Sequence, residues 1–309
     1  MQFSKFLFSL MLSLLLMVSV MGQSIQSDEF LSEGAKIHYV TAGSGTPLIL
    51  IHGFSDNISI CYQDTLDREG TTFISKLAKR YKVIALDVKG HGKSDKPIEA
   101  HYYGKELQED VIRLMDHLGI EKAHVMGYSM GAFITGNLLI DYPERLISAT
   151  LIGGAPLTQS QYSPDHELIS LINATSEALE KGEGITPLLQ WFWPGHQAEP
   201  SLEELGQINK KILTEQDTEA LKVCMASLTA LCQVDEEKLM QSDIPVTLIN
   251  GTDDPLRHDI VRFQRLKRSN SVLIDGANHM DILMYAECLE AVDKSLSLVD
   301  MQVGRAISK

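Results

Sequence analysis

The sequence predicts an α/β fold: a mostly parallel, open sheet flanked by helices, with a helical cap inserted into it. Three observations predict this class. Strand-like and helix-like segments alternate from about Gly34 onward. Several strand candidates, such as 48–51 and 83–86, are uninterrupted apolar runs, which is typical of parallel strands buried on both faces. The alternation then breaks between 156 and 242, where helical patterns follow one another with few strand signals.

The remaining elements follow from the same periodicities. Strands are expected at 36–40, 47–51, 82–87, 122–126, 147–152, 245–250 and 271–274. Helices are expected at 72–80, 105–118, 130–141, 258–267 and 281–298. We therefore expect residues 23–155 and 243–309 to form the sheet domain and 156–242 to form the cap. An insertion at this point would lie over the loops that gather at the strand ends.

Residues 1–22 have the pattern of a signal peptide. Lys5 gives the first residues the positive charge of an n-region, and an almost unbroken apolar run follows from Phe6 to Met21. Cleavage is expected after Gly22, with Val20 at the −3 position. We expect a secreted or periplasmic protein. An uncleaved membrane anchor is the main alternative, although serines interrupt the run and it is short for a span of about 20 residues. A buried helix is the third possibility.

Length and charge limit the kinds of partner. A chain of 309 residues can hold one large α/β domain with an inserted subdomain. The formal net charge of −14 argues against the basic patch that binding to a polyanion requires, so we expect no nucleic-acid partner. A small-molecule substrate is expected instead.

The cysteines and histidines predict neither a disulfide framework nor a metal site. Four cysteines in a chain of this length are expected to be small buried side chains: Cys61, Cys224, Cys232 and Cys288. Cys224 and Cys232 are expected to share one helical segment, too far apart to form a disulfide with each other. The sequence leaves open whether Cys61 forms a disulfide. The ten histidines are scattered without zinc-like spacing. We expect no metal and no cofactor.

The segment from Gly127 to Gly131 is the most informative motif. It has the form Gly-x-Ser-x-Gly and places Ser129 between a strand candidate at 122–126 and a helical pattern that runs to Pro143. In such an elbow the serine is held in a strained conformation that projects its hydroxyl from the sheet, and the glycines fit where strand and helix pack closely. Ser129 is therefore the candidate nucleophile.

A second loop is placed to stabilise negative charge. The strand candidate at 47–51 runs into His52-Gly53-Phe54, where a backbone N–H can face the elbow. Acyl transfer develops charge on a carbonyl oxygen, and a preorganised donor stabilises it by roughly 3–4 kcal/mol. We expect the backbone N–H groups of Phe54 and Met130 to be these donors. We expect His52 to brace the loop by hydrogen bonds.

An acid and a histidine follow two later strands. The strand candidate at 245–250 ends near Asp253 and Asp254, and the strand candidate at 271–274 is followed by His279. The carboxyl ends of such strands meet at one edge of the sheet, where these folds build their sites. Histidine can take a proton from a serine hydroxyl, and a buried carboxylate orients the imidazole. Spacing alone does not decide whether Asp253 or Asp254 orients the imidazole.

With these parts in the order Ser, Asp, His, the chain resembles an α/β-hydrolase from about Gly34 to Leu298. The segment 87–97 is similar to a structural loop of that family, which implies that His91 is not catalytic. The acid of the family usually stands three residues after the glycine that ends its strand. The resemblance therefore maps the acid onto Asp254.

The resemblance also implies an activity. Relatives that hydrolyse haloalkanes or epoxides carry aspartate at the elbow, whereas this chain has Ser129. Serine members include carboxylesterases, lactonases and carbon–carbon bond hydrolases. We expect a hydrolase that cleaves an ester or lactone through an acyl-enzyme. Cleavage of a carbon–carbon bond in a diketone by the same residues is the alternative, and a ligand-binding protein without catalysis is a third possibility.

The cap carries two tryptophans, Trp191 and Trp193, on either side of Phe192. Large aromatic side chains of this kind either pack within a core or form a pocket wall. Both interpretations stay open from the sequence, and the second makes Trp191 and Trp193 candidates for a substrate pocket.

Overall fold

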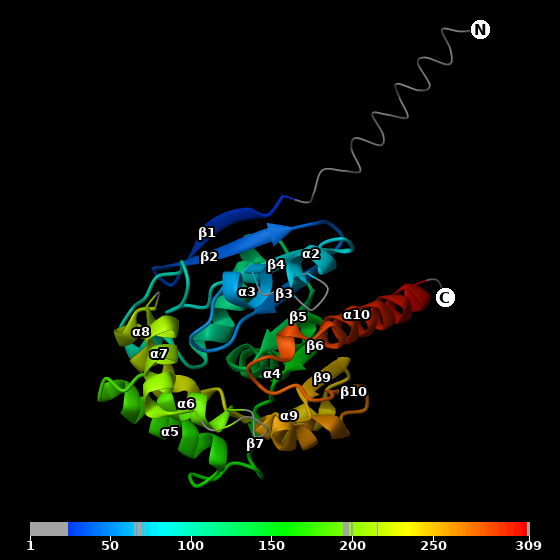
Figure 1. The fold of residues 1–309 in the computed structure, drawn as a ribbon. Helices are drawn as coiled ribbons and strands as arrows, with labels where there is room; N and C mark the ends of the chain where they lie inside the picture. The colour runs from blue at the N-terminus through cyan, green and yellow to red at the C-terminus, as the bar shows by residue number, and fades with distance from the viewer. Residues whose placement is uncertain are drawn as a thin grey trace, which may run out of the picture.

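The computed structural model describes residues 24–64, 66, 70, 72–193, 198, 200–214 and 216–307 (Figure 1). The predicted signal peptide, residues 1–22, lies outside the described residues. Among the helices that are described, none is both long enough and apolar enough to cross a membrane.

An eight-stranded sheet forms the centre of the protein, in the order β1-β2-β4-β3-β5-β6-β9-β10. The first two strands, β1 (Gln26–Ser32) and β2 (Ala35–Ala42), are antiparallel and form one edge. The other six strands run parallel: β4 (Tyr81–Leu86), β3 (Thr46–Ile51), β5 (Ala123–Tyr128), β6 (Leu146–Ile152), β9 (Val246–Gly251) and β10 (Ser269–Ile274). The predicted fold class is confirmed.

Helices cover both faces of the sheet, as the apolar strands require. In β3, Ile49 and Ile51 belong to one buried cluster, and the alternate residues Leu48 and Leu50 belong to the other. The first cluster also contains apolar residues of α3 (Glu106–His117) and α4 (Met130–Asp141). The second contains those of α2 (Phe73–Leu77) and α10 (Ala286–Ile307). Each central strand is therefore buried on both sides.

Between β6 and β9 the chain leaves the sheet and forms mainly helices: α5 (Glu167–Glu180), α6 (Thr186–Trp191), α7 (Leu202–Leu213), α8 (Thr218–Ser227) and α9 (Glu236–Gln241). Two short strands, β7 (Leu157–Thr158) and β8 (Gln233–Val234), pair with each other in this stretch. Helices α5 to α8 pack on one another and gather on one side of the sheet (Figure 1). We call these four helices, with the residues between them, the insert.

Three elements differ from expectation. The strand β1 was not predicted, because at the sheet edge only Phe30 and Ser32 are buried and the strand lacks an apolar pattern. The helix expected at 258–267 is instead two 3₁₀ helices, η5 (Pro255–Val261) and η6 (Phe263–Arg265). The helix expected from residue 281 is preceded by a separate turn, η7 (Ile282–Met284). In both cases short turns bury a few apolar side chains without a continuous helical face.

Candidate active site

Ser129 occupies the turn between β5 and α4 in a strained backbone conformation, with φ of 53° and ψ of −116°. Non-glycine residues rarely adopt this region, so the surrounding structure must hold it. A Cβ on Gly127 would lie 1.9 Å from the carbonyl oxygen of Gly131, and a Cβ on Gly131 would lie 2.1 Å from that of Ile51. Both positions therefore require glycine, because the backbone comes too close for any side chain.

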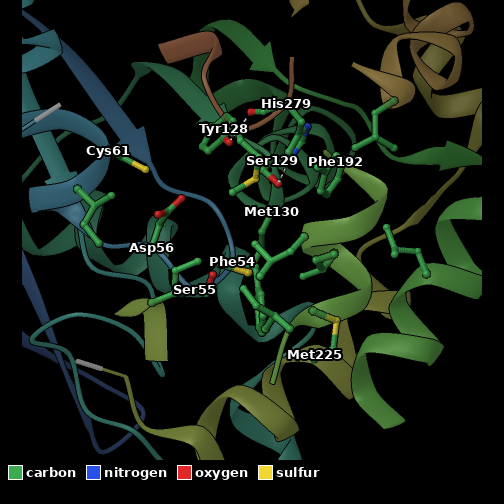
Figure 2. Close-up of a pocket in the computed structure, with 18 of the residues that line it drawn as sticks. Phe54, Ser55, Asp56, Cys61, Tyr128, Ser129, Met130, Phe192, Met225 and His279 are labelled. Atoms are coloured by element: carbon green, nitrogen blue, oxygen red, sulfur yellow. Dashed lines mark hydrogen bonds between the residues drawn. The ribbon is translucent and has the colours of Figure 1, made fainter. Parts of the chain in front are cut away.

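The structure brings Ser129, His279 and Asp254 into a continuous hydrogen-bonded chain. The Nε2 atom of His279 lies 2.9 Å from Ser129 Oγ (Figure 2), and its Nδ1 atom lies 3.0 Å from Asp254 Oδ2. Both His279 and Asp254 are buried. We assign the ring proton to Nδ1, where it is donated to the carboxylate, so that Nε2 accepts from the serine hydroxyl.

The two neighbouring aspartates have different surroundings. The other oxygen of Asp254, Oδ1, accepts the backbone N–H of Leu256 at 2.9 Å, which fixes the carboxylate at the start of η5. Asp253 is exposed. Of the two candidates that spacing left open, Asp254 is the one that contacts His279.

The imidazole of His279 is held in place from several sides. Phe192 stacks on it, with ring centroids 3.7 Å apart and an angle of 10° between the planes. Tyr128 donates its hydroxyl to the backbone oxygen of His279 at 2.7 Å. A Cβ on Gly153 would come within 3.2 Å of the ring. The ring therefore has little freedom to turn away from Ser129.

The loop after β3 passes directly beside the nucleophile. A Cβ on Gly53 would lie 3.2 Å from Ser129 Cβ. Phe54 and Met130, the two predicted backbone donors, both border the same pocket as Ser129. Met130 is the first residue of α4, so its N–H has no acceptor within the helix and is free to face a ligand.

Two buried histidines support this loop. His52 donates from Nδ1 to the Gly53 oxygen at 2.7 Å and accepts the Val88 N–H at Nε2, at 2.9 Å, so it braces the loop as expected. His91 packs edge-on against the Phe54 ring. Burial, which disfavours the charged imidazole, lowers the pKa of His91 to about 3. His91 therefore stays neutral and structural.

Ser129 and His279 open into a pocket of about 660 Å³. One side is formed by Phe54, Tyr128, Ser129, Met130 and His279. We call these residues, together with the buried His52 and Asp254 that hold them in place, the sheet wall. The other side, the insert wall, is formed by residues of α5 to α8 and is almost entirely apolar. Enclosed apolar pockets with a few convergent polar groups are typical of small-molecule sites.

A family model described as the alpha/beta hydrolase fold matches residues 46–181, which include the elbow and the loop after β3. This match agrees with the sheet order and with the elbow. The chain has the α/β-hydrolase fold.

Relatives of this α/β-hydrolase have several activities. It is 28% identical over 246 residues to 3-oxoadipate enol-lactonase 2 of Acinetobacter baylyi, covering 74% of this chain and 80% of that one. It is 33% identical over 180 residues to 2-hydroxy-6-oxo-6-phenylhexa-2,4-dienoate hydrolase of Comamonas testosteroni, covering 58% of this chain and 54% of that one. A third relative is the dihydrolipoyllysine-residue acetyltransferase component of the acetoin cleaving system of Pseudomonas putida. The two sequences are 38% identical over 116 residues, which cover 38% of this chain and only 29% of that one.

The fold of this α/β-hydrolase is shared with solved structures. One is the crystal structure of a membrane phospholipase A, with a TM-score of 0.69, 22% identity and coverage of 96% of this chain and 99% of that chain. At this identity the likeness establishes the fold alone.

The two tryptophans of the α/β-hydrolase do not border the pocket, which corrects one prediction. Trp191 packs against the main core, and Trp193 donates its Nε1–H to the Ala198 oxygen at 3.0 Å. Phe192, between them, lines the pocket instead. Successive side chains point in different directions, and the sequence holds no signal that selects the middle one.

The sequence also missed two polar groups beside the nucleophile, Asp56 and Cys61. Both border the pocket, and their side chains lie close to each other (Figure 2). Burial raises the pKa of the Asp56 carboxyl and of the Cys61 thiol. An acidic residue three positions after Gly53, on the loop that carries Phe54, is the signal that could have found Asp56. All four cysteines are free and buried.

Metal-ligating side chains do not cluster in the described part of this α/β-hydrolase. No group of three His, Cys, Asp or Glu side chains gathers there as a cation site.

Proposed function

We propose that this α/β-hydrolase cleaves a carboxylic ester or lactone through an acyl-enzyme on Ser129. The observation that carries the proposal is the hydrogen-bonded chain from Ser129 through His279 to Asp254, which ends in an enclosed pocket. A serine hydroxyl becomes a nucleophile only when a base takes its proton, and this arrangement supplies the base and its orienting carboxylate.

The reaction follows from the positions of the groups. His279 Nε2 takes the Ser129 proton while Oγ attacks the ester carbonyl carbon. The negative oxygen that forms accepts hydrogen bonds from the N–H groups of Phe54 and Met130. The resulting imidazolium, stabilised by Asp254, returns the proton to the departing alkoxide. Water then attacks the acyl-enzyme by the same sequence and releases the acid, or the hydroxy acid from a lactone.

A carbon–carbon bond hydrolase is the second candidate. It is favoured by the 33% identity to the dienoate hydrolase over more than half of this chain. The same base and nucleophile would then act on a ketone, and the leaving group would be a stabilised carbanion. Epoxide hydrolysis through an aspartyl ester is disfavoured, because the elbow carries Ser129 and not aspartate.

Active-site labelling combined with substrate panels tests the proposal. We expect a fluorophosphonate probe to label the wild-type protein at Ser129 and activated short esters and lactones to be turned over. Ser129→Ala should abolish labelling and lower kcat by about 10⁵ to 10⁶-fold with the fold intact. Ser170→Ala is the matched control, since Ser170 is exposed on α5.

Three outcomes would contradict the ester proposal. Diketone turnover that exceeds ester turnover on the same preparation would favour the second candidate. A wild-type protein that neither labels nor turns over any of these substrates would remove both. Tight binding of an ester without conversion would indicate a ligand-binding member of the fold.

A further inference from the structure

We propose that the closed end of the pocket is an acyl-chain site, so that the enzyme prefers esters of medium and long unbranched acyl groups to short ones. The acyl-chain site depends on the proposed ester hydrolysis at Ser129 and names the substrate class of that reaction. The pocket divides into two ends of different character, and Ser129 lies between them.

The closed end is buried and wholly apolar. Six side chains from α5, α6, α8 and the turn that follows α8 line it, and each is only 1–7% exposed: Leu168, Leu171, Ile172, Leu189, Met225 and Leu228. A polar group placed among them would lose its hydrogen bonds to water without replacement, which disfavours polar substituents. A hydrocarbon chain would gain free energy with each methylene buried.

The open end is marked by exposed side chains that also border the pocket. Ile60, Met280 and Met284 are 44%, 50% and 50% exposed, respectively. Lys211, on α7, borders the pocket and is exposed as well. In Figure 2, Met225 and Phe192 lie on one side of Ser129, and the polar side chains of Asp56 and Cys61 lie on the other. The pocket therefore has an apolar end under the insert and a second end that reaches exposed side chains.

The direction of proton transfer assigns the two halves of the ester to these ends. The departing alkoxide must lie beside His279 Nε2 to receive its proton. Met280, the next residue after His279, borders the pocket and is exposed, so a route to solvent lies close to this atom. In the proposed orientation the alcohol group faces this route. The acyl group then points to the closed end under the insert, whose apolar side chains suit a hydrocarbon chain.

An acyl-length series is the first test. We would measure kcat/KM for p-nitrophenyl esters from acetyl through butyryl, hexanoyl and octanoyl to lauroyl, all as monomers in solution. Burying one methylene gains at most about fourfold in kcat/KM. We expect octanoyl to exceed acetyl by more than about tenfold. Fluorophosphonates whose alkyl chains have the same lengths as these acyl groups should label Ser129 at rates that follow the same order as kcat/KM.

Opposite substitutions at one position of the closed end separate chain selection from damage to the fold. Met225→Trp should shorten the preferred chain and Met225→Ala should lengthen it, so that the ratio of lauroyl to butyryl kcat/KM changes by about tenfold or more between them. Ala226→Trp places the same indole at the exposed neighbouring position of α8 and should leave the ratio unchanged. A general loss of folding would lower kcat/KM for both esters by the same factor and leave their ratio unchanged.

The outcomes distinguish this inference from the proposed function. If Ser129 is labelled but acetyl and octanoyl esters have equal kcat/KM, the acyl-chain site is wrong and the esterase stands. If the chain length of the alcohol determines kcat/KM and that of the acyl group does not, the assigned orientation is wrong. If Ser129 is neither labelled nor active, the proposed function is overturned and the acyl-chain site with it.

Discussion

The two walls of the pocket are built by different forces. The sheet wall holds its side chains by hydrogen bonds: His52 to the backbone of its own loop, Tyr128 to the backbone of His279, and Asp254 to both His279 and Leu256. The insert wall is held by apolar packing. Hydrogen bonds fix atoms at set distances, whereas apolar contacts tolerate changes of shape. The reaction therefore depends on one wall, and the choice of substrate depends on the other.

The largest effect is expected at the carboxylate of the sheet wall. Asp254→Asn should lower kcat by about 10⁴-fold, because an amide at this position favours the wrong tautomer of His279 and no longer stabilises its cation. Steady-state kinetics on a short ester measures the effect. The unfolding midpoint should change little, since the asparagine oxygen can still accept the Leu256 N–H.

Asp253→Asn is the matched control for this prediction. Asp253 is adjacent in the chain but exposed, so kcat should stay within about threefold of the wild type. Equal losses for the two variants would contradict the role given to Asp254 and would remove the hydrogen-bonded basis of the sheet wall.

Most of the sheet wall could be predicted from the sequence because local rules determine it. The elbow needs Gly127 and Gly131 at fixed positions, because backbone oxygens lie only 1.9 and 2.1 Å from where their Cβ atoms would be. The acid and the base follow the ends of β9 and β10, and parallel strands bring such ends to one edge. Short-range patterns of this kind are visible in a single sequence.

The insert wall could not be predicted in the same detail. Which of Trp191, Phe192 and Trp193 enters the pocket depends on how α6 docks against its neighbours, and docking is set by many weak contacts between distant residues. Asp56 was missed for a related reason, since only the folded loop places it next to Cys61. Strand β1 was missed because an edge strand needs no apolar alternation.

A pH effect on stability is expected from the buried His91, which packs against Phe54 of the sheet wall. The unfolded histidine binds a proton below its ordinary pKa of 6.5, whereas the folded one does so only near about 3, because burial disfavours its cation. Since the folded pKa is lowered, the contribution of this residue to stability is present above about pH 6.5 and is lost as pH falls, at about 1.4 kcal/mol per pH unit.

The variant His91→Gln removes this titration. The free energy of unfolding can be measured in urea at about pH 6 and about pH 4. Between these two pH values the wild type should lose roughly 2–3 kcal/mol more than the variant. The glutamine amide can still donate toward the Lys89 oxygen that His91 contacts. A constant difference between the two proteins at both pH values would show that folding does not lower the pKa of His91.

Asn209 is the matched test in the insert, where it is one of the few buried polar side chains. Its oxygen accepts the Ile185 N–H at 2.9 Å, and its amide donates to Thr186 Oγ1 at 2.7 Å, which joins α6 to α7. Asn209→Ala would leave a buried N–H without a partner, at a cost of about 1–3 kcal/mol. Hydrogen exchange should show faster opening of α6 and α7, with the sheet unchanged. Faster exchange throughout the protein would instead mean that insert and sheet unfold together.

The smallest expected effect lies at the contact where the two walls meet, the stack of Phe192 on His279. Phe192→Ala removes a ring 3.7 Å from the imidazole and should lower kcat/KM for a short ester by about tenfold, since the base gains freedom to turn from Ser129. Trp193→Phe changes the neighbouring ring outside the pocket and should alter kcat/KM by less than about twofold. A loss confined to long-chain esters would show that Phe192 only shapes the acyl-chain site. Equal losses for short and long esters would show that the insert also orients the base, so that catalysis and selection are not fully divided between the walls.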